Sequence, residues 1–227
     1  MGVGMLPVNV PEKTVRRLSQ YARCLRQASL RGESTVTSRE LARNCGVSSS
    51  SVRNDLSYYG EFGKQGSGYS VSGLLANIKT ILGKINPPGV IVLGAGHIGT
   101  ALVESGLSDA DGYEYQAIFD SNPARVGISI AGIKVQPLSE LSAACDENTI
   151  AVIAVSPGKG QEALEALAEG GCQAVISFNL EPLNPPEGLS LRYMGVSTEL
   201  DLLSHSIRSK KARRSHHDRM ELSQLTQ

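Results

Sequence analysis

The hydrophobic positions of the chain change their period near residue 86. Before it, apolar residues recur at helical spacing, as with Val15, Leu18 and Ala22, which indicates amphipathic helices. After it, short continuous apolar runs alternate with helical patterns, and this alternation is typical of a mostly parallel, doubly wound sheet. The chain is therefore predicted to have an α/β fold, in which a helical N-terminal domain precedes a Rossmann-type sheet.

Local signals set the expected bounds of these elements. In the N-terminal domain, helices are expected over residues 12–28, 38–44, 48–58 and 74–85. In the sheet domain, strands are expected over 90–93, 115–119, 150–155, 174–178 and 190–193, with a hairpin over 130–135 and helices over 100–105, 138–144, 161–168 and 197–207.

The N-terminal helices have the order of a winged helix-turn-helix. Thr37 to Glu40 has the T-x-x-E form of a capping box and is expected to start the second helix. Gly46 is expected to end that helix, and a four-residue turn leads to the third helix. The glycine-rich segment 60–71 predicts a β hairpin with its tip at 63–68 and Tyr69 and Val71 on the returning strand. In a winged helix the third helix enters the major groove and the hairpin tip touches the flanking backbone or minor groove. The alternative is a small helical cap with a glycine-rich loop.

The charge distribution indicates a polyanionic partner at the N-terminal end. The formal net charge is zero, but residues 1–85 carry 12 Lys and Arg against 5 Asp and Glu, residues 86–207 carry 4 against 15, and residues 208–227 carry 6 against 2. Such asymmetry favours phosphate contact by the basic part. The candidate contacts to double-stranded DNA lie on the third helix and the hairpin tip: Ser49, Ser50, Ser51, Arg53, Asn54, Ser57, Tyr58, Lys64 and Gln65.

Residues 90–99, Val-Ile-Val-Leu-Gly-Ala-Gly-His-Ile-Gly, join an apolar run to a G-x-G-x-x-G turn. A strand before this motif and a helix after it are the context of a dinucleotide site. Gly94 would permit the tight turn, Gly96 the approach of the pyrophosphate to the backbone, and Gly99 the close packing of helix on strand. The helix start would offer its N–H groups to the phosphates.

Asp120 ends the next apolar run, 21 positions after Gly99. Its carboxylate is expected to accept hydrogen bonds from the adenosine ribose hydroxyls and to repel a 2′-phosphate, which favours NAD(H) over NADP(H). Arg125 is near enough in sequence to soften that preference, and Asp120 would also suit a turn. The strand ends should line one crevice, and the predicted cofactor contacts are Gly94, Ala95, Gly96, His97, Ile98, Gly99, Asp120, Val155, Ser156 and Pro157.

Composition restricts the remaining chemistry. None of the four cysteines is in a C-x-x-C pair and there are only four histidines, which predicts reduced, mostly buried thiols and no metal cluster. No run of 18 apolar residues and no signal segment is present, so a cytoplasmic protein without a membrane partner is expected. The domains are predicted at 1–84 (winged helix), 85–195 (Rossmann), 196–208 (C-terminal helix) and 209–227 (a basic tail expected to be disordered).

Three segments together resemble the Rex family of redox-sensing transcriptional repressors. They are Val-Pro-Glu-Lys-Thr-Val-Arg-Arg-Leu at 10–18, Val-Arg-Asn-Asp-Leu-Ser-Tyr-Tyr-Gly-Glu-Phe-Gly-Lys at 52–64, and Gly-Ala-Gly-His-Ile-Gly at 94–99, and the similarity runs from about residue 8 to about residue 207. The resemblance implies a homodimer that binds an inverted-repeat operator when NAD⁺ prevails and leaves it when NADH rises. It also implies that the helix over 197–207 is exchanged between subunits; packing within one chain is the alternative.

Several positions depart from the family pattern. The family usually has Lys where this chain has Asn54 and Arg where it has Gln65, so two cations per subunit are missing and the operator should differ or be bound more weakly. A Tyr–Asp–Arg network that separates the cofactor states would retain only Arg23, because Ser105 and Gly195 replace its other two members. After Phe178 the usual Ala-Pro is Asn-Leu. These changes predict dinucleotide binding with weaker redox discrimination.

Two other functions are compatible with parts of the sequence. An NAD-dependent oxidoreductase would need a substrate domain, for which no residues remain, and none of His97, His205, His216 and His217 is placed as a catalytic acid; no catalytic or metal-ligating residue is predicted. A DNA-binding paralogue that senses another ligand, or only the partner protein, is the third possibility.

Overall fold

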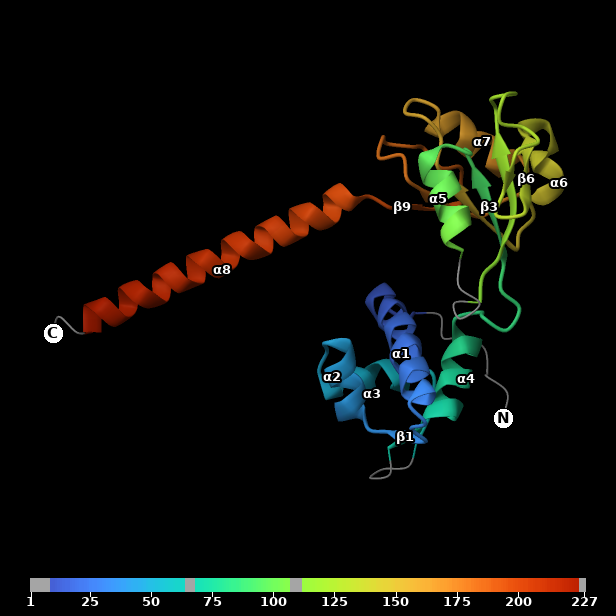
Figure 1. Cartoon of the computed structure of the whole chain (residues 1–227). Coiled ribbons are helices and arrows are strands. Elements are labelled where there is room, and N and C mark those ends of the chain that lie inside the picture. Colours follow the sequence, from blue (N-terminus) through green and yellow to red (C-terminus); the bar gives the residue numbers. More distant parts are fainter. Residues whose placement is uncertain (1–8, 64–67, 107–111, 225–227) are drawn as a thin grey trace. The chain divides into compact units, whose positions relative to one another are not determined.

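The computed structural model of the chain (Figure 1) describes residues 9–63, 68–106 and 112–224, and the side chains among them up to residue 210. It divides the chain into two compact units. The first comprises residues 1–88 together with 108–113, and the second comprises residues 89–107 together with 114–227. Each unit has its own buried apolar core.

The first unit is the predicted helix-turn-helix domain. Its elements are α1 (Glu12–Leu30), β1 (Thr35–Val36), α2 (Ser38–Cys45), α3 (Ser49–Ser57), β2 (Tyr69–Ser70) and α4 (Val71–Ile81). The capping box that starts α2 is complete, with the Thr37 side chain accepting from Glu40 N and the Glu40 carboxylate accepting from Thr37 N. Gly46 ends α2 in the left-handed conformation at φ +66°, and the Ser48 hydroxyl caps α3 by accepting from Ser51 N.

The wing differs from the predicted hairpin. β2 pairs antiparallel with β1, the short strand between α1 and α2, in the register Val36 with Tyr69. Val71, which was expected on the returning strand, begins α4 instead, because the Ser70 hydroxyl accepts from Gly73 N and caps a helix there. The Lys64 and Gln65 tip lies outside the described residues.

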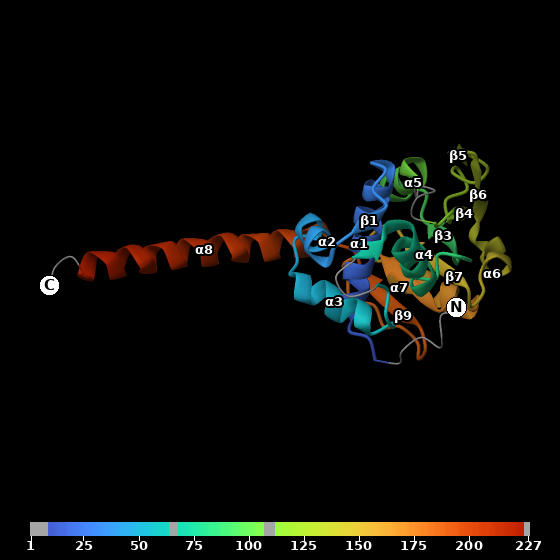
Figure 2. The ribbon, with the colours of Figure 1, turned by 90° about the horizontal axis from the view of Figure 1, so that it is seen from below.

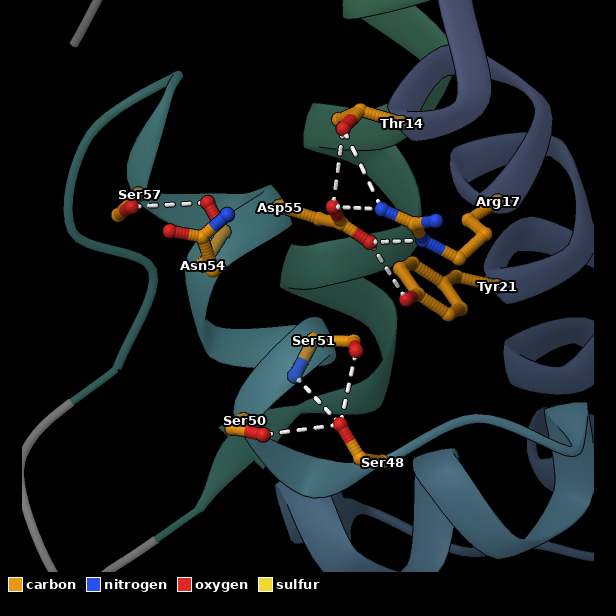
Figure 3. A network of polar contacts seen from close by, with 9 residues as sticks. All are labelled: Thr14, Arg17, Tyr21, Ser48, Ser50, Ser51, Asn54, Asp55 and Ser57. Carbon is orange, nitrogen blue, oxygen red and sulfur yellow. Dashed lines mark hydrogen bonds and ion pairs between the residues drawn. The ribbon is translucent and has the colours of Figure 1, made fainter. Parts of the chain in front are cut away.

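The core of the first unit is apolar except around one carboxylate. Asp55 of α3 is fully buried. Its Oδ1 accepts from Arg17 Nη2 at 2.5 Å and from the Thr14 hydroxyl at 3.0 Å, and its Oδ2 accepts from Arg17 Nε at 2.6 Å and from the Tyr21 hydroxyl at 2.7 Å. Figure 3 shows all three donors on α1, on the side of α3 away from Asn54 and Ser57.

This network sets the ionisation of Asp55 and fixes two helices together. Burial by itself would raise the pKa of Asp55, but the hydrogen bonds from Arg17, Tyr21 and Thr14 outweigh it and hold the pKa below its usual value. The same contacts raise the pKa of Arg17. The carboxylate therefore stays charged, and its bidentate pair with Arg17 holds α3 on α1.

The second unit is a Rossmann-type α/β sheet with strand order β5-β6-β4-β3-β7-β8-β9. All its strand pairs are parallel except β5 with β6. Its strands are β3 (Gly89–Leu93), β4 (Tyr115–Asp120), β5 (Ser129–Ile130), β6 (Ile133–Pro137), β7 (Thr149–Ile153), β8 (Ala174–Ser177) and β9 (Ser190–Tyr193), and its helices are α5 (His97–Ser105), η1 (Leu138–Glu140), α6 (Leu141–Ala144), α7 (Gly160–Glu169) and α8 (Val196–Gln224). The predicted fold class is confirmed.

Helices cover both faces of this sheet. Alternate residues of the central strands, such as Ile91 and Phe119, pack with Leu141 of α6 and Leu164 of α7 into one core. The opposite face of β3 meets α5, where Gly99 lies against Val92. This follows from right-handed crossovers, because the connection from β3 to β4 runs one way across the sheet and those from β6 to β7 and from β7 to β8 run the other way.

The C-terminal helix is longer than expected. α8 runs for 29 residues to Gln224 without a break (Figures 1 and 2), whereas the sequence predicted a helix to residue 207 and a disordered tail from 209. The segment contains no Gly or Pro, and four Leu, four Arg and two Lys are among its residues, so helix propensity continues where apolar periodicity stops. Leu200, Leu203 and Ile207 are more than half exposed, so the described residues of the second unit leave this apolar stripe uncovered.

The buried carboxylate generates a stability prediction. We expect Asp55→Ala to lower the free energy of unfolding of the first unit by about 3 kcal/mol, because Arg17 loses its buried partner. Arg16→Ala is the control, since its pair with Glu12 is exposed and should contribute less than about 0.5 kcal/mol. Urea unfolding of the full chain, followed by hydrogen exchange of α1 and α3 amides, measures both. Equal losses in the two variants would contradict the assignment.

The same network predicts a pH dependence. Because the folded-state pKa of Asp55 is lowered, its contribution is present above the ordinary carboxyl pKa of about 3.9 and is lost as the pH falls from there through the folded-state value. The wild-type protein should therefore lose more stability than Asp55→Ala between pH 5 and pH 3, roughly the range in which carboxylates titrate. Parallel pH series of unfolding would test it.

Candidate functional site

The described residues of the second unit enclose a cavity of about 560 Å³ at the C-terminal ends of the central strands. β3 is the first strand of this sheet in sequence, and the chain continues from it to β4 on one side and later to β7 on the other. In open α/β sheets such a switch point is where ligands bind. Of the predicted cofactor residues, those that line the cavity are Gly94, Gly96, His97, Ile98, Asp120, Val155 and Ser156, while Ala95, Gly99 and Pro157 are outside its lining.

The three motif glycines are required for different reasons. Gly94 has φ +103°, and a Cβ there would lie 2.3 Å from the carbonyl oxygen of Ala154. A Cβ on Gly99 would lie 1.8 Å from the carbonyl oxygen of Gly94. Gly96 is in extended conformation, and a Cβ there would meet only Arg125 Nη1, at 3.3 Å. The fold therefore needs Gly94 and Gly99, whereas Gly96 leaves its space to the cavity.

Two helix N-termini reach this edge of the sheet, and they differ electrically. α7 begins beside Lys159, and the carboxylate of Glu181 accepts there from the backbone N–H groups of Gly158 at 2.8 Å and Gly160 at 3.0 Å. α5 begins after Gly96 and has no side-chain cap. Since the first N–H groups of a helix attract anions, the vacant positive end at the cavity is that of α5.

Asp120 stands at the end of β4 and is held in place. Its Oδ2 accepts from Ala95 N and its Oδ1 accepts from Asn122 N, each at 2.8 Å, and Arg125 Nη1 lies 3.6 Å from Oδ2. The first contact ties the carboxylate to the glycine turn. A carboxylate has about four acceptor positions, so Asp120 retains capacity for further donors.

Some residues that line the cavity were not among the cofactor contacts predicted from the sequence. Lys159, Leu138 and Asn122 line it, and the positions after strand ends were the signal that could have pointed to them. Asn179, which the sequence singled out as a departure from the family pattern, follows β8 and is buried outside the lining of the cavity. Its Nδ2 donates to Ser156 O at 3.3 Å, while its Oδ1 has no partner among the described residues. A buried acceptor without a donor is costly, which suits a site completed by a ligand.

The outer face of α3 is polar and small. Ser50, Arg53, Asn54, Ser57 and Tyr58 are exposed, and Ser49 and Ser51 are partly so. The Ser48 hydroxyl joins those of Ser50 and Ser51 at 2.8 and 2.7 Å (Figure 3), and Arg53 Nη1 donates to the Ser38 hydroxyl at 3.2 Å. This face carries one cation and a row of hydroxyl and amide groups, which can read base edges or phosphates.

Metal-ligand clusters and membrane-spanning helices are both absent from the described residues. No group of three or more His, Cys, Asp and Glu side chains gathers there as a metal site. None of the described helices is both long enough and apolar enough to cross a membrane.

Comparison with known proteins agrees with both parts of the chain. A family model described as "Putative DNA-binding protein N-terminus" matches residues 9–57, and one described as "CoA binding domain" matches residues 86–180. A redox-sensing transcriptional repressor Rex of Roseiflexus sp. is 39% identical over 81% of this chain and 84% of its own, and one of Desulforamulus reducens is 34% identical over 91% of this chain and 100% of its own. The chain belongs to the Rex family of redox-sensing transcriptional repressors.

Solved structures of a Rex-family repressor, RSP, have the same fold. RSP in complex with β-NAD⁺ and operator DNA has a TM-score of 0.81 at 27% identity and covers 92% of this chain and 97% of its own. RSP in complex with β-NADH has a TM-score of 0.77 at 25% identity and covers 91% of this chain and 98% of its own. The predicted family is thereby confirmed.

The structure shows what surrounds two positions that depart from the Rex pattern. The Ser105 hydroxyl donates to Leu102 O at 2.8 Å, within its own helix. A Cβ on Gly195 would lie 2.5 Å from a methyl group of Leu180, so the second residue of the unusual Asn-Leu pair fills the space beside the glycine. The residues at 180 and 195 are therefore in contact, and a side chain at 195 would require the exposed Leu180 side chain to move.

The glycine geometry predicts opposite outcomes for two neighbouring substitutions. Gly99→Ala should lower the stability of the second unit by at least about 2 kcal/mol, because its methyl group pushes α5 off the carbonyl of Gly94. Gly96→Ala should change it by less than about 1 kcal/mol, since only a mobile Arg125 side chain must move. Thermal unfolding of the two variants checks this. A stable Gly99→Ala protein would show that α5 does not pack on β3 as described.

Proposed function

We propose that this protein is an NAD(H)-responsive transcriptional repressor that reports the NADH/NAD⁺ ratio. In this proposal a homodimer binds an inverted-repeat operator and leaves it when NADH binds. The observation that carries the proposal is the presence, in one Rex-family chain, of a helix-turn-helix with an exposed polar reading face and a switch-point cavity with an uncapped helix N-terminus. RSP, a relative of the same fold, has been solved with NAD⁺ and operator DNA and with NADH.

The dinucleotide would lie across the C-terminal edge of the sheet. Its pyrophosphate would meet the N–H groups that begin α5, over the space left by Gly96, with Arg125 as a nearby cation. The hydroxyl groups of the adenosine ribose would donate to Asp120, whose carboxylate accepts from Ala95 N in the glycine turn. The remaining cofactor contacts assigned from the sequence, Ala95, Gly99 and Pro157, would support this frame rather than line the cavity.

The nicotinamide end would then reach the segment 155–157 after β7. Asn179 lies beside this segment through its bond to Ser156 O, with Oδ1 unsatisfied among the described residues. A nicotinamide carboxamide carries an N–H₂ group that could supply the missing donor. This gives the chain a polar residue for the nicotinamide pocket where the family usually has alanine.

Operator binding would use α3 and the wing. Ser50, Arg53, Asn54, Ser57 and Tyr58 would face the major groove, with Ser49 and Ser51 at the helix start near a phosphate. The Lys64 and Gln65 contacts stay a proposal on sequence grounds alone. With Asn54 in place of the family's Lys, recognition would depend more on amide and hydroxyl hydrogen bonds and less on counterion release.

The homodimer would form through α8. Leu200, Leu203 and Ile207 make an apolar stripe at helical spacing and are exposed in the single chain, so a second chain is the partner that would bury them. The response would be a population shift, in which NADH favours a dimer whose reading helices no longer fit successive major grooves. We propose a cytoplasmic regulator without catalytic activity, since the cavity's histidine, His97, lies in the phosphate turn.

The decisive experiment compares NADH and NAD⁺ on operator binding at fixed salt. Fluorescence anisotropy of a labelled inverted-repeat duplex, selected from random sequence by this protein, should show the Kd rise at least tenfold with saturating NADH and less than about threefold with NAD⁺. Arg53→Ala should raise the Kd about tenfold without changing NADH affinity. Gly96→Val should keep operator binding and lose the NADH response.

The alternatives give different results in the same assay. Equal affinities for NADH, NAD⁺ and ADP by calorimetry, with unchanged anisotropy, would mean that the nicotinamide is not read and would overturn the redox part. Coenzyme A is a useful further competitor, because a CoA-binding family model covers the sheet. Oxidation of NADH that depends on an added substrate would indicate an enzyme.

Asp120 generates a prediction on cofactor preference. Asp120→Ala should raise NADPH affinity relative to NADH by about tenfold, because the repulsion of a 2′-phosphate is removed and Arg125, 3.6 Å from Oδ2, becomes available to it. Asp120→Asn is the control that can still accept from Ala95 N without the charge, and it should shift the ratio while preserving the turn. An unchanged ratio in both would exclude ribose contact.

A further inference from the structure

Two cysteines that are remote in sequence meet in the first unit. Cys24 of α1 and Cys45, the last residue of α2, are 21 positions apart, and their sulfur atoms lie 2.7 Å from each other. Both side chains are half-buried against the core of the unit, and no cysteine of the chain is in a disulfide. The sequence predicted reduced, mostly buried thiols without a C-x-x-C pair, and it gave no indication that Cys24 and Cys45 meet.

The geometry points to a redox-active dithiol: we propose that Cys24 and Cys45 form a reversible intrachain disulfide on reaction with a hydroperoxide. This is a modification site in the DNA-binding unit, independent of the dinucleotide. A disulfide has an S–S distance of about 2.05 Å, so the two sulfurs need to approach by less than 1 Å, roughly the freedom of side-chain adjustment.

The roles of the two sulfurs differ. Burial raises the pKa of Cys45 to about 12, and the neighbouring Cys24 adds to the shift. Cys45 is therefore a thiol at neutral pH, and since the thiolate is the nucleophile, the first attack is assigned to Cys24. Arg23, beside Cys24 in sequence and exposed, is a cation next to the reacting pair.

The chemistry balances in two steps. The Cys24 sulfur attacks the terminal oxygen of the hydroperoxide; an S–O bond forms, the O–O bond breaks, and the leaving alkoxide takes a proton to become an alcohol. The Cys45 sulfur then attacks the sulfenic sulfur; the S–S bond forms, the S–O bond breaks, and water leaves with the Cys45 proton. The thiols lose two electrons, which reduce the peroxide to alcohol and water.

The consequence follows from where the two residues lie. Cys45 precedes Gly46 and the turn into α3. Cys24 is on α1, the helix whose Arg17 pairs with Asp55 of α3. The disulfide would thus tie α1 to the end of α2 with little change in backbone position. We expect oxidation to stabilise the folded unit against unfolding and to leave operator affinity unchanged.

The test uses the full-length reduced protein and tert-butyl hydroperoxide. Denaturation in N-ethylmaleimide and intact mass should show four alkylated thiols before oxidation and two after it, and peptide mapping should find Cys24 linked to Cys45, reversed by dithiothreitol. Cys24→Ser and Cys45→Ser should each abolish the link. The matched control is the double variant of the other two cysteines, Cys145→Ser with Cys172→Ser, which should retain it.

Two further readouts bear on the consequence. The thermal midpoint of the first unit should rise by about 5 °C or more on oxidation, and operator Kd should change less than threefold. A link to Cys145, a link between chains, or a tenfold loss of operator affinity in the linked protein would overturn the proposal. The mass readout does not involve DNA or NADH, so it stands or fails apart from the proposed function.

Discussion

The close approach of backbone at Gly94 and Gly99 is the constraint from which the rest of the second unit follows. With no Cβ at either position, β3 can turn beside Ala154 of the neighbouring strand segment and α5 can lie against the carbonyl of Gly94. That packing aims the start of α5 along the edge of the sheet, and it brings Ala95 N within 2.8 Å of Asp120. The cavity, its positive helix end and its carboxylate therefore depend on the same two glycines.

The first unit is organised by a charge instead. Its helix α3 is short and mostly polar, so apolar packing alone does little to fix the orientation of α3 relative to α1. Asp55 supplies the missing constraint, because a buried bidentate pair with Arg17 fixes both the position and the rotation of α3 on α1. Such a pair contributes little net stability compared with an apolar contact, but it is specific in geometry. That specificity keeps Arg53 and Asn54 on the exposed face of α3, as the proposed operator contact requires.

Local patterns predicted most of this, and long-range contacts explain what they missed. The glycine turn, the capping box and the alternation of strands and helices each depend on short segments whose periods and spacings are visible in the sequence. The pairing of β2 with a two-residue strand near Thr35, the burial of Asp55 and the meeting of Cys24 with Cys45 each join residues more than 20 positions apart. α8 was misjudged because low apolar content was taken as disorder, although no residue in it stops a helix.

The two proposed redox inputs are chemically independent. NADH delivers a hydride and equilibrates with NAD⁺ only through enzymes, whereas a dithiol exchanges electrons with peroxides and other thiols. The dinucleotide cavity is built wholly from the second unit and the Cys24–Cys45 pair wholly from the first. In these proposals NADH releases the operator, whereas the crosslink stabilises the fold of the first unit and leaves operator affinity unchanged. NADH would therefore set operator occupancy, and peroxide would set the stability of the unit that binds the operator.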